Sequence, residues 1–149
     1  MQLPKFCDRL SELILDDSDN ITIAKFGEKI GFRGSTVSLW KTGKRVPSLQ
    51  NIICLAEYFN CSIDFLLGRI DNDIQVKRIK NLPLFHEHLL SILNARSLSW
   101  YKVVQDTSVS KSSLKSWRYG STPLLPTLIE LANYLKVSVD YLVGRDDQP

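Results

Sequence analysis

The chain has 149 residues, and its 19 Lys and Arg against 16 Asp and Glu leave a formal net charge of +3, too small by itself to indicate a polyanionic partner. An apolar fraction of 44% with mixed charges excludes an intrinsically disordered chain. No apolar run reaches the roughly 18 residues of a membrane span, and the charged N-terminus lacks the apolar core of a secretory signal. We therefore expect a globular protein of the cytoplasm, with its three cysteines reduced.

The first two predicted helices are marked by apolar spacing and by their ends. The first helix has apolar residues at helical spacing, namely Phe6, Leu10, Leu13 and Ile14. The polar run at residues 16–20 ends it. Thr22 is the expected N-cap of a second helix, which buries Phe26 and Ile30 and closes at Gly31.

A third helix is predicted over residues 34–42, since Val37 and Trp40 are spaced to face inward together. Gly43 ends it. The surrounding stretch, residues 31–48, contains several cations and no acid, whereas the acids of the first 70 residues lie elsewhere. This segregation, and not the net charge, indicates a phosphate-bearing partner.

Two further helices complete the first half. Ser48 is the expected N-cap of the fourth, whose apolar residues are Leu49, Ile52, Ile53, Ala56 and Phe59. Ser62 is the expected N-cap of a short fifth helix before Gly68, with Asp64 in its first turn favouring the helix dipole. No useful length of sequence alternates with period two, so we expect an all-α fold without a sheet.

The second half of the chain repeats the first. The segment LAEYFNCSIDFLLGR at residues 55–69 matches LANYLKVSVDYLVGR at residues 131–145 position for position. The Trp and Gly of the acid-free stretch recur as Trp117 and Gly120. The apolar residues of the first helix align with Phe85, Leu89, Ile92 and Leu93. We interpret the chain as two copies of one five-helix module.

The repeat predicts two domains, residues 1–70 and residues 83–149, joined by a polar linker at residues 71–82. The apolar residues of the linker fit no clean helical stripe, so an extended linker and a short helix both stay open. The linker would reach roughly 40 Å if extended and about 18 Å as a helix.

A short helix, a tight turn and a second helix held across it form a helix-turn-helix unit, which presents its second helix to the DNA major groove. Residues 21–69 and, more loosely, residues 98–145 resemble the phage-repressor (Cro/C1, or XRE-type) helix-turn-helix family through their basic-Trp, Gly, Pro and SxDxLLGR markers. The resemblance implies two tandem five-helix lambda-repressor-like domains. It also implies a transcriptional regulator, expected to be a repressor and not an enzyme, that binds double-stranded DNA with recognition helices near 34–42 and 111–119.

The predicted DNA contacts combine outward residues of the recognition helices, basic residues for phosphates and the first backbone N–H groups of capped helices. In the first copy they are Thr22, Arg33, Ser35, Thr36, Ser38, Lys41, Lys44 and Arg45. In the second copy they are Ser99, Trp100, Ser110, Lys111, Ser112, Ser113, Lys115, Ser116 and Arg118. Lys41, Lys44 and Arg45 form the expected phosphate clamp, and the second copy has the richer polar reading face.

Some residues depart from the family pattern. Ile23 and Trp100 occupy a position where the family often has a DNA-contacting glutamine, and Leu39 is an apolar residue on the outward face. These replacements support an alternative in which one or both copies are protein-interaction or dimerisation modules, antitoxin-like or adaptor-like. Val104 replaces Gly27, so the second copy is expected to pack differently. Trp100 would either touch the sugar-phosphate backbone or cover the linker.

Other features have structural explanations. Trp40 and Trp117 are expected in the core, and the basic stretches could be ordinary solvated faces. His86 and His88 lie on different helix faces, so we expect no metal site, and no motif indicates a cofactor or a catalytic group. Because the sequence ends soon after the second module, no small-molecule ligand is expected. An extended linker would let one chain span two half-sites, whereas a packed helical linker favours a homodimer.

Overall fold

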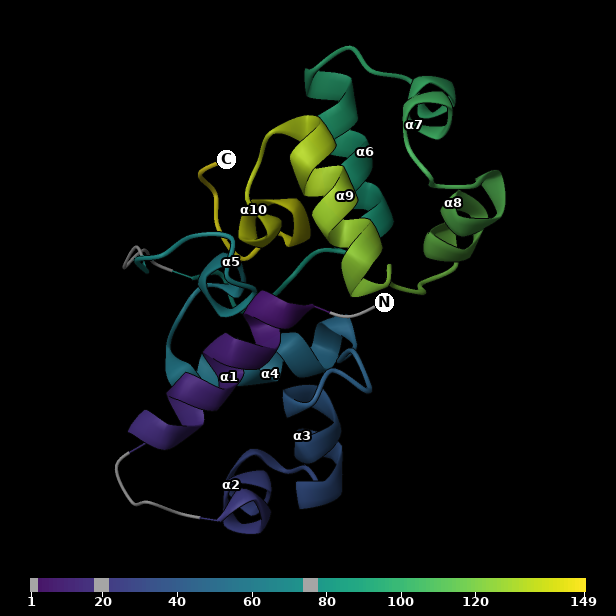
Figure 1. Cartoon of the computed structure of the whole chain (residues 1–149). Coiled ribbons are helices and arrows are strands. Elements are labelled where there is room, and N and C mark those ends of the chain that lie inside the picture. Colours follow the sequence, from purple (N-terminus) through teal and green to yellow (C-terminus); the bar gives the residue numbers. More distant parts are fainter. Residues whose placement is uncertain (1–2, 18–21, 74–77) are drawn as a thin grey trace. The chain divides into compact units, whose positions relative to one another are not determined.

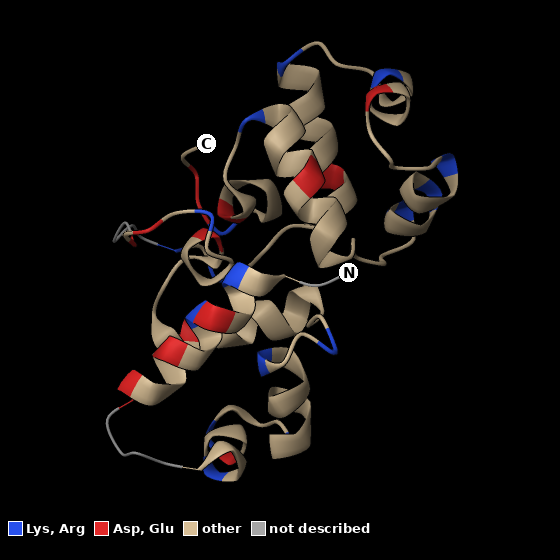
Figure 2. Ribbon diagram, in the orientation of Figure 1, with Lys and Arg blue, Asp and Glu red and all other residues tan. Residues whose placement is uncertain are grey.

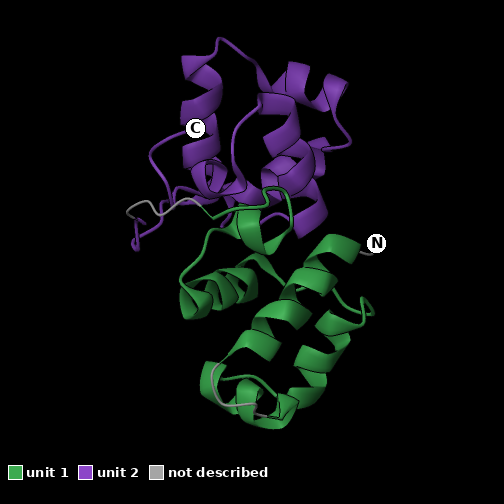
Figure 3. Cartoon of the chain, turned by 60° about the vertical axis from the view of Figure 1, so that its left-hand side comes forward, with its two compact units in different colours: residues 1–75 green, residues 76–149 purple. Residues whose placement is uncertain are grey.

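The computed structural model describes residues 3–17, 22–73 and 78–149, which contain ten helices and no strand (Figure 1). The expected all-α fold is confirmed. The chain forms two compact units, residues 1–75 and residues 76–149 (Figure 3). None of the helices in the described ranges is long and apolar enough to cross a membrane.

Unit 1 contains five helices around one apolar core. They are α1 (Pro4–Asp16), α2 (Ile23–Ile30), α3 (Gly34–Lys41), α4 (Leu49–Phe59) and α5 (Ile63–Leu66). The residues least exposed to solvent are Phe6, Leu10, Phe26, Val37, Trp40, Ile52, Leu55, Ala56, Ile63 and Leu66. Ile30, Ile53 and Phe59 were expected to be buried, but all three are only half-buried. Leu55, which was not among the expected core residues, is fully buried.

The helix starts of unit 1 follow the predicted caps. The Thr22 hydroxyl accepts a hydrogen bond from the Lys25 N–H at 3.3 Å. Ser48 accepts one from Asn51 at 3.2 Å. Each cap satisfies one of the backbone donors that a helix start leaves without an intrahelical partner, which explains why these helices begin at hydroxyl residues.

Unit 2 contains the other five helices. They are α6 (Phe85–Ala95), α7 (Trp100–Asp106), α8 (Lys111–Arg118), α9 (Leu125–Leu135) and α10 (Val139–Val143). Ser99 accepts a hydrogen bond from Lys102 N–H at 3.1 Å, and Ser110 accepts one from Ser113 N–H at 3.1 Å. Trp117 is buried as expected, whereas Leu114 is only half-buried.

The SxDxLLGR marker is explained by a cap and a carboxylate–guanidinium pair at the end of each unit. Ser62 and Ser138 cap α5 and α10. Asp64 pairs with Arg69 in unit 1, and Asp140 pairs with the Arg145 guanidinium at 2.6 Å in unit 2. Asp140 and Arg145 are 2% and 1% exposed, so this pair lies inside the core. The polar residues of the marker are therefore structural.

The predicted linker, residues 71–82, falls partly on residues 74–77, which lie outside the described residues. Its described parts are not helical. Asp73 accepts a hydrogen bond from the Ser62 N–H at 3.1 Å in unit 1, and the Ile79 N–H donates to the Arg145 carbonyl at 2.8 Å in unit 2. Both ends of the segment are thus held by the unit they adjoin.

Candidate nucleic-acid interface

In unit 1 the helices α2 and α3 cross at a distance that only small residues allow. A Cβ atom on Gly27 would lie 2.5 Å from the carbonyl oxygen of Phe32 and 3.1 Å from the nitrogen of Gly34. A Cβ atom on Gly34 would lie 2.9 Å from the Cα of Ala24. Gly31 closes α2 with a φ of 82°, in the left-handed region that favours glycine. These glycines hold the two helices and their turn in one tight arrangement.

The core fixes which side of α3 faces outward. Val37 and Trp40 are 0% and 1% exposed, and the Trp40 ring meets Phe32 edge-on at 5.1 Å between centroids. Trp40 is therefore a core residue and no platform for stacking bases. The predicted contact residues on and before α3 are at least partly accessible: Arg33 and Ser35 are exposed, while Thr36, Ser38 and Lys41 are half-buried.

The loop after α3 presents cations to solvent. Lys44 and Arg45 are both exposed, and their N–H groups donate to the Leu39 carbonyl at 3.0 and 3.2 Å. Gly43 precedes them with a φ of 75°. Figure 2 shows the cations of this loop and of the end of α3 apart from the acids gathered on α1. A local concentration of positive charge on a backbone held by hydrogen bonds is suited to bind phosphate.

The corresponding helices of unit 2, α7 and α8, do not pack closely. Val104, Tyr101 and Lys111 align with Gly27, Ala24 and Gly34. Side chains of that size cannot fit the close crossing found in unit 1. Val104 predicted different packing in unit 2 from the sequence, whereas Tyr101 and Lys111 were not recognised as further obstacles to a close crossing.

A carboxylate supports the turn between α7 and α8. Glu130 of α9 accepts hydrogen bonds from the Ser108 N–H at 2.6 Å and from the Ser108 hydroxyl. These hydrogen bonds stabilise the ionised form, so the pKa of Glu130 lies below its ordinary value. The turn is thus tied to α9, a contact for which the sequence carries no local signal.

The outward surface of α8 is polar and basic. Its exposed residues are Lys111, Ser112, Lys115, Ser116 and Arg118, and Ser113 is half-buried. The Ser110 hydroxyl lies 2.9 Å from that of Ser112 and 3.0 Å from that of Ser113. The Ser116 hydroxyl lies 2.6 Å from that of Ser121. The connection to α9 contains no Lys or Arg, so the cations of unit 2 are confined to the helix itself.

Trp100 takes a position that neither sequence alternative described. It is half-buried at the start of α7, and its ring stacks on His86 of α6 with centroids 5.3 Å apart and planes 16° from parallel. The ring thus packs on His86, and its contact with the sugar-phosphate backbone or with the linker stays a prediction. A stacked, half-buried ring also has less surface left for a sugar-phosphate backbone.

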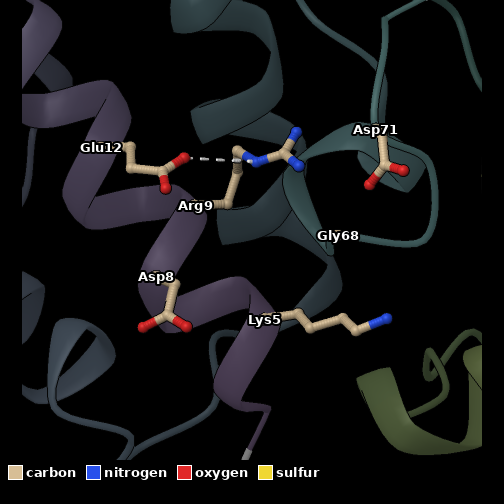
Figure 4. Close-up of a pocket in the computed structure, with 6 residues that line it drawn as sticks. All are labelled: Lys5, Asp8, Arg9, Glu12, Gly68 and Asp71. Atoms are coloured by element: carbon tan, nitrogen blue, oxygen red, sulfur yellow. Dashed lines mark ion pairs between the residues drawn. The ribbon is translucent and has the colours of Figure 1, made fainter.

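A shallow cavity of about 220 Å³ opens beside α1 in unit 1 (Figure 4). It is lined by Lys5, Asp8, Arg9, Glu12, Gly68 and Asp71. Arg9 lies over the Phe65 ring at 3.9 Å and pairs with Glu12 at 3.8 Å, so this cation is used inside the unit. No group of His, Cys, Asp and Glu in the described residues could hold a metal ion.

Unit 1 therefore has the geometry of a helix-turn-helix protein, with an anchored second helix and a basic loop beside it. A family model described as "Helix-turn-helix" matches residues 16–66, all within unit 1. The HTH-type transcriptional regulator YobD of Bacillus subtilis (strain 168) is 32% identical over 83 residues, which cover 55% of this chain and 71% of YobD. The chain belongs to this family of helix-turn-helix transcriptional regulators.

A second relative is more distant. The HTH-type transcriptional activator BcrR of Enterococcus faecalis is 21% identical over 98 residues, which cover 64% of this chain and 47% of BcrR. The chain thus matches less than half of BcrR. No solved structure matches the chain significantly.

Proposed function

We propose that the chain is a transcriptional repressor that binds double-stranded DNA by placing α3 of unit 1 in the major groove. The observation that carries this proposal is the close crossing of α2 and α3, which anchors α3 through Val37 and Trp40 and leaves its other side outward in an acid-free stretch. Ser35 and Ser38 would then meet base edges. Lys41, Lys44 and Arg45 would hold phosphates on either side.

We propose that unit 2 is a diverged second copy whose α8 adds contacts. Lys111, Ser112 and Lys115 are exposed on α8 and carry the donors and acceptors needed for phosphates or base edges. The second candidate function is that unit 2 serves protein interaction. It is favoured by the large residues at the α7–α8 crossing and by the absence of cations in the following loop.

The direct test is binding of the full chain to duplex DNA as a function of salt concentration. Affinity should fall steeply as salt rises. The double variant Lys44→Ala, Arg45→Ala should reduce the slope of log K against log salt by roughly 0.9 for each phosphate that the protein no longer neutralises. The matched control, Lys5→Ala with Lys80→Ala, removes two exposed cations outside the acid-free stretch and should leave the slope unchanged. Absence of binding by the unmodified chain at low salt would contradict the proposal.

Selection of sites from a random DNA pool tests which units read sequence. Lys111→Ala with Ser112→Ala should change the preferred bases if α8 reads DNA, and Ser35→Ala should change a different position. Gly34→Ala is a poor comparison, because its Cβ would press on Ala24 and disturb the α2–α3 crossing. An unchanged preference in the α8 variant would favour the protein-interaction role for unit 2.

A further inference from the structure

The outward side of α3 contains one large apolar side chain among hydroxyls. Leu39 is half-buried and follows Ser35 by one helical turn, so the two share a side of the helix away from the buried Val37 and Trp40. Ser38, next to Leu39, is also half-buried. Ser35 and Ser38 can donate and accept hydrogen bonds, whereas Leu39 offers only apolar contact.

The helix does not require a leucine at this position. The aligned residue of unit 2 is Ser116, which is exposed on α8. Its hydroxyl lies 2.6 Å from that of Ser121. The same module therefore forms its helix with a small polar residue there, whereas the half-buried leucine of unit 1 leaves apolar surface in water. A contact with a partner would remove that surface from water.

The charges around Leu39 limit what can contact it. Its carbonyl oxygen accepts hydrogen bonds from the N–H groups of Lys44 and Arg45 at 3.0 and 3.2 Å, so the backbone of the basic loop is held against this residue. Residues 31–48 contain no acid. A second copy of the same surface would bring like charges together, which is unfavourable. The surroundings of Leu39 therefore suit a polyanion that also presents an apolar group.

Duplex DNA presents such an apolar group in its major groove. The 5-methyl group of thymine stands there among the hydrogen-bond donors and acceptors of the base edges. An apolar side chain placed over guanine or over the amino group of cytosine would instead leave a polar atom without water and without a partner. Serine hydroxyls contact several bases, because they both donate and accept. Leu39 thus has a narrower base preference than Ser35 or Ser38.

We propose that Leu39 selects a thymine in the bound site by packing on its 5-methyl group. The inference rests on the proposed function, since α3 must lie in the major groove for this contact to form. It goes further, because it assigns to an apolar residue a sequence preference that the serines of α3 do not provide. Lys44 and Arg45 would hold phosphates whatever the base.

The test compares thymine with uracil in the duplex site that the full chain selects from a random DNA pool. Deoxyuridine pairs with adenine as thymidine does and lacks only the methyl group. When the thymines are replaced one at a time, uracil at one position should weaken binding by the unmodified chain roughly fourfold. Leu39→Ala should bind the thymine and uracil duplexes equally at that position. Leu39→Met, which keeps an apolar side chain, should retain the difference. The matched control is Leu15→Ala, which truncates a leucine of α1 that is 75% exposed and should also retain it.

Three results would overturn the inference. They are a selected site without thymine, an unmodified chain whose affinity is unchanged by uracil at every thymine, and a folded Leu39→Ala variant that still loses affinity with uracil at the same position. Circular dichroism melts show whether the variant is folded, and an unchanged salt slope shows that its phosphate contacts are intact. Failure of the proposed function is distinct, because the unmodified chain would then bind no duplex at low salt. In each of the three results above it binds DNA but does not read a methyl group through Leu39.

Discussion

The two units have the same order of five helices, and hydroxyl residues cap both α2 and α7 and both α5 and α10. The units differ where α2 meets α3 and α7 meets α8. In unit 1, Gly27 and Gly34 allow the two backbones to approach, and a single added Cβ would collide. In unit 2 the aligned residues are Val104 and Lys111, and α7 and α8 do not pack closely. This difference shows that local sequence sets where the helices form, whereas the distance at which two helices cross depends on the size of a few residues between them.

The same contrast extends to the surface beside the recognition helices. Unit 1 follows α3 with the exposed cations Lys44 and Arg45. Unit 2 follows α8 with the exposed apolar residues Tyr119 and Leu124. The family model also matches only residues of unit 1. These differences favour the proposed DNA binding by unit 1 and, for unit 2, the second candidate function of protein interaction.

The largest expected effect concerns the two carboxylate–guanidinium pairs. Asp140→Ala should lower the free energy of unfolding by about 4 kcal/mol, because Arg145 is 1% exposed and cannot hydrate in place of the missing carboxylate. Asp64→Ala should cost about 2 kcal/mol, because the Arg69 side chain is 22% exposed and reaches water. Urea denaturation followed by circular dichroism measures both. Equal losses of unfolding free energy in the two variants would show that burial does not determine how much each pair contributes to stability.

The next effect concerns the helix crossing. Gly27→Ala should lower the stability of unit 1 by about 3 kcal/mol, because the new Cβ meets backbone atoms that cannot move aside independently. Val104→Ala, at the aligned position of unit 2, should cost no more than about 1 kcal/mol, because Val104 is half-buried. Thermal and urea unfolding of the two variants give the comparison. A fully stable Gly27→Ala variant would contradict the tight crossing.

A smaller effect should appear at the helix caps. Leu124→Ser should raise stability by about 1 kcal/mol by restoring an N-cap to α9. Ser48→Leu should lower it by about the same amount by removing the cap of α4. Both are measured by urea unfolding of dilute protein. If Leu124→Ser were destabilising instead, Leu124 would have a packing role inside unit 2.

The smallest effect is a pH dependence specific to unit 2. The pKa of Glu130 is lowered by hydrogen bonds from Ser108, so its stabilising contribution is complete above its ordinary value of 4.5 and is lost as the pH falls through the lower folded value. Glu130→Gln should cost less than about 1 kcal/mol at neutral pH, because the pair is solvent-accessible. The difference from the unmodified chain should vanish in acid. Unfolding measured from pH 7 down to about pH 3 tests this, and Cys54→Ser, at the aligned position of unit 1, should show no such dependence.

Much of the fold follows from local sequence. Thr22, Ser48, Ser62, Ser99 and Ser110 were all predicted as caps, and each accepts the expected hydrogen bond. Caps and helical spacing are predictable because they involve residues three or four positions apart. Lys44 and Arg45 were predicted as phosphate contacts from the acid-free stretch, and both are exposed. Their contact with DNA stays a prediction.

Other features of the candidate site could not be predicted in this way. The stacking of Trp100 on His86 joins the starts of α6 and α7, and the bond between Ser108 and Glu130 joins a turn to α9. Asp140 and Arg145 belong to the SxDxLLGR marker recognised in the sequence, but their burial depends on how other helices pack around them. No periodicity reports such contacts, because the partners are far apart in the chain or covered by other elements.

By itself the amino-acid sequence determined where the helices begin, which residues cap them, and which stretches contain clustered cations and no acidic residue. These properties depend on backbone hydrogen bonds and on the spacing of neighbouring residues. Only the tertiary structure decided that α2 and α3 cross closely while α7 and α8 do not, and that Leu124 is left exposed in place of a cap. Those outcomes depend on which distant side chains and backbone atoms compete for the same space.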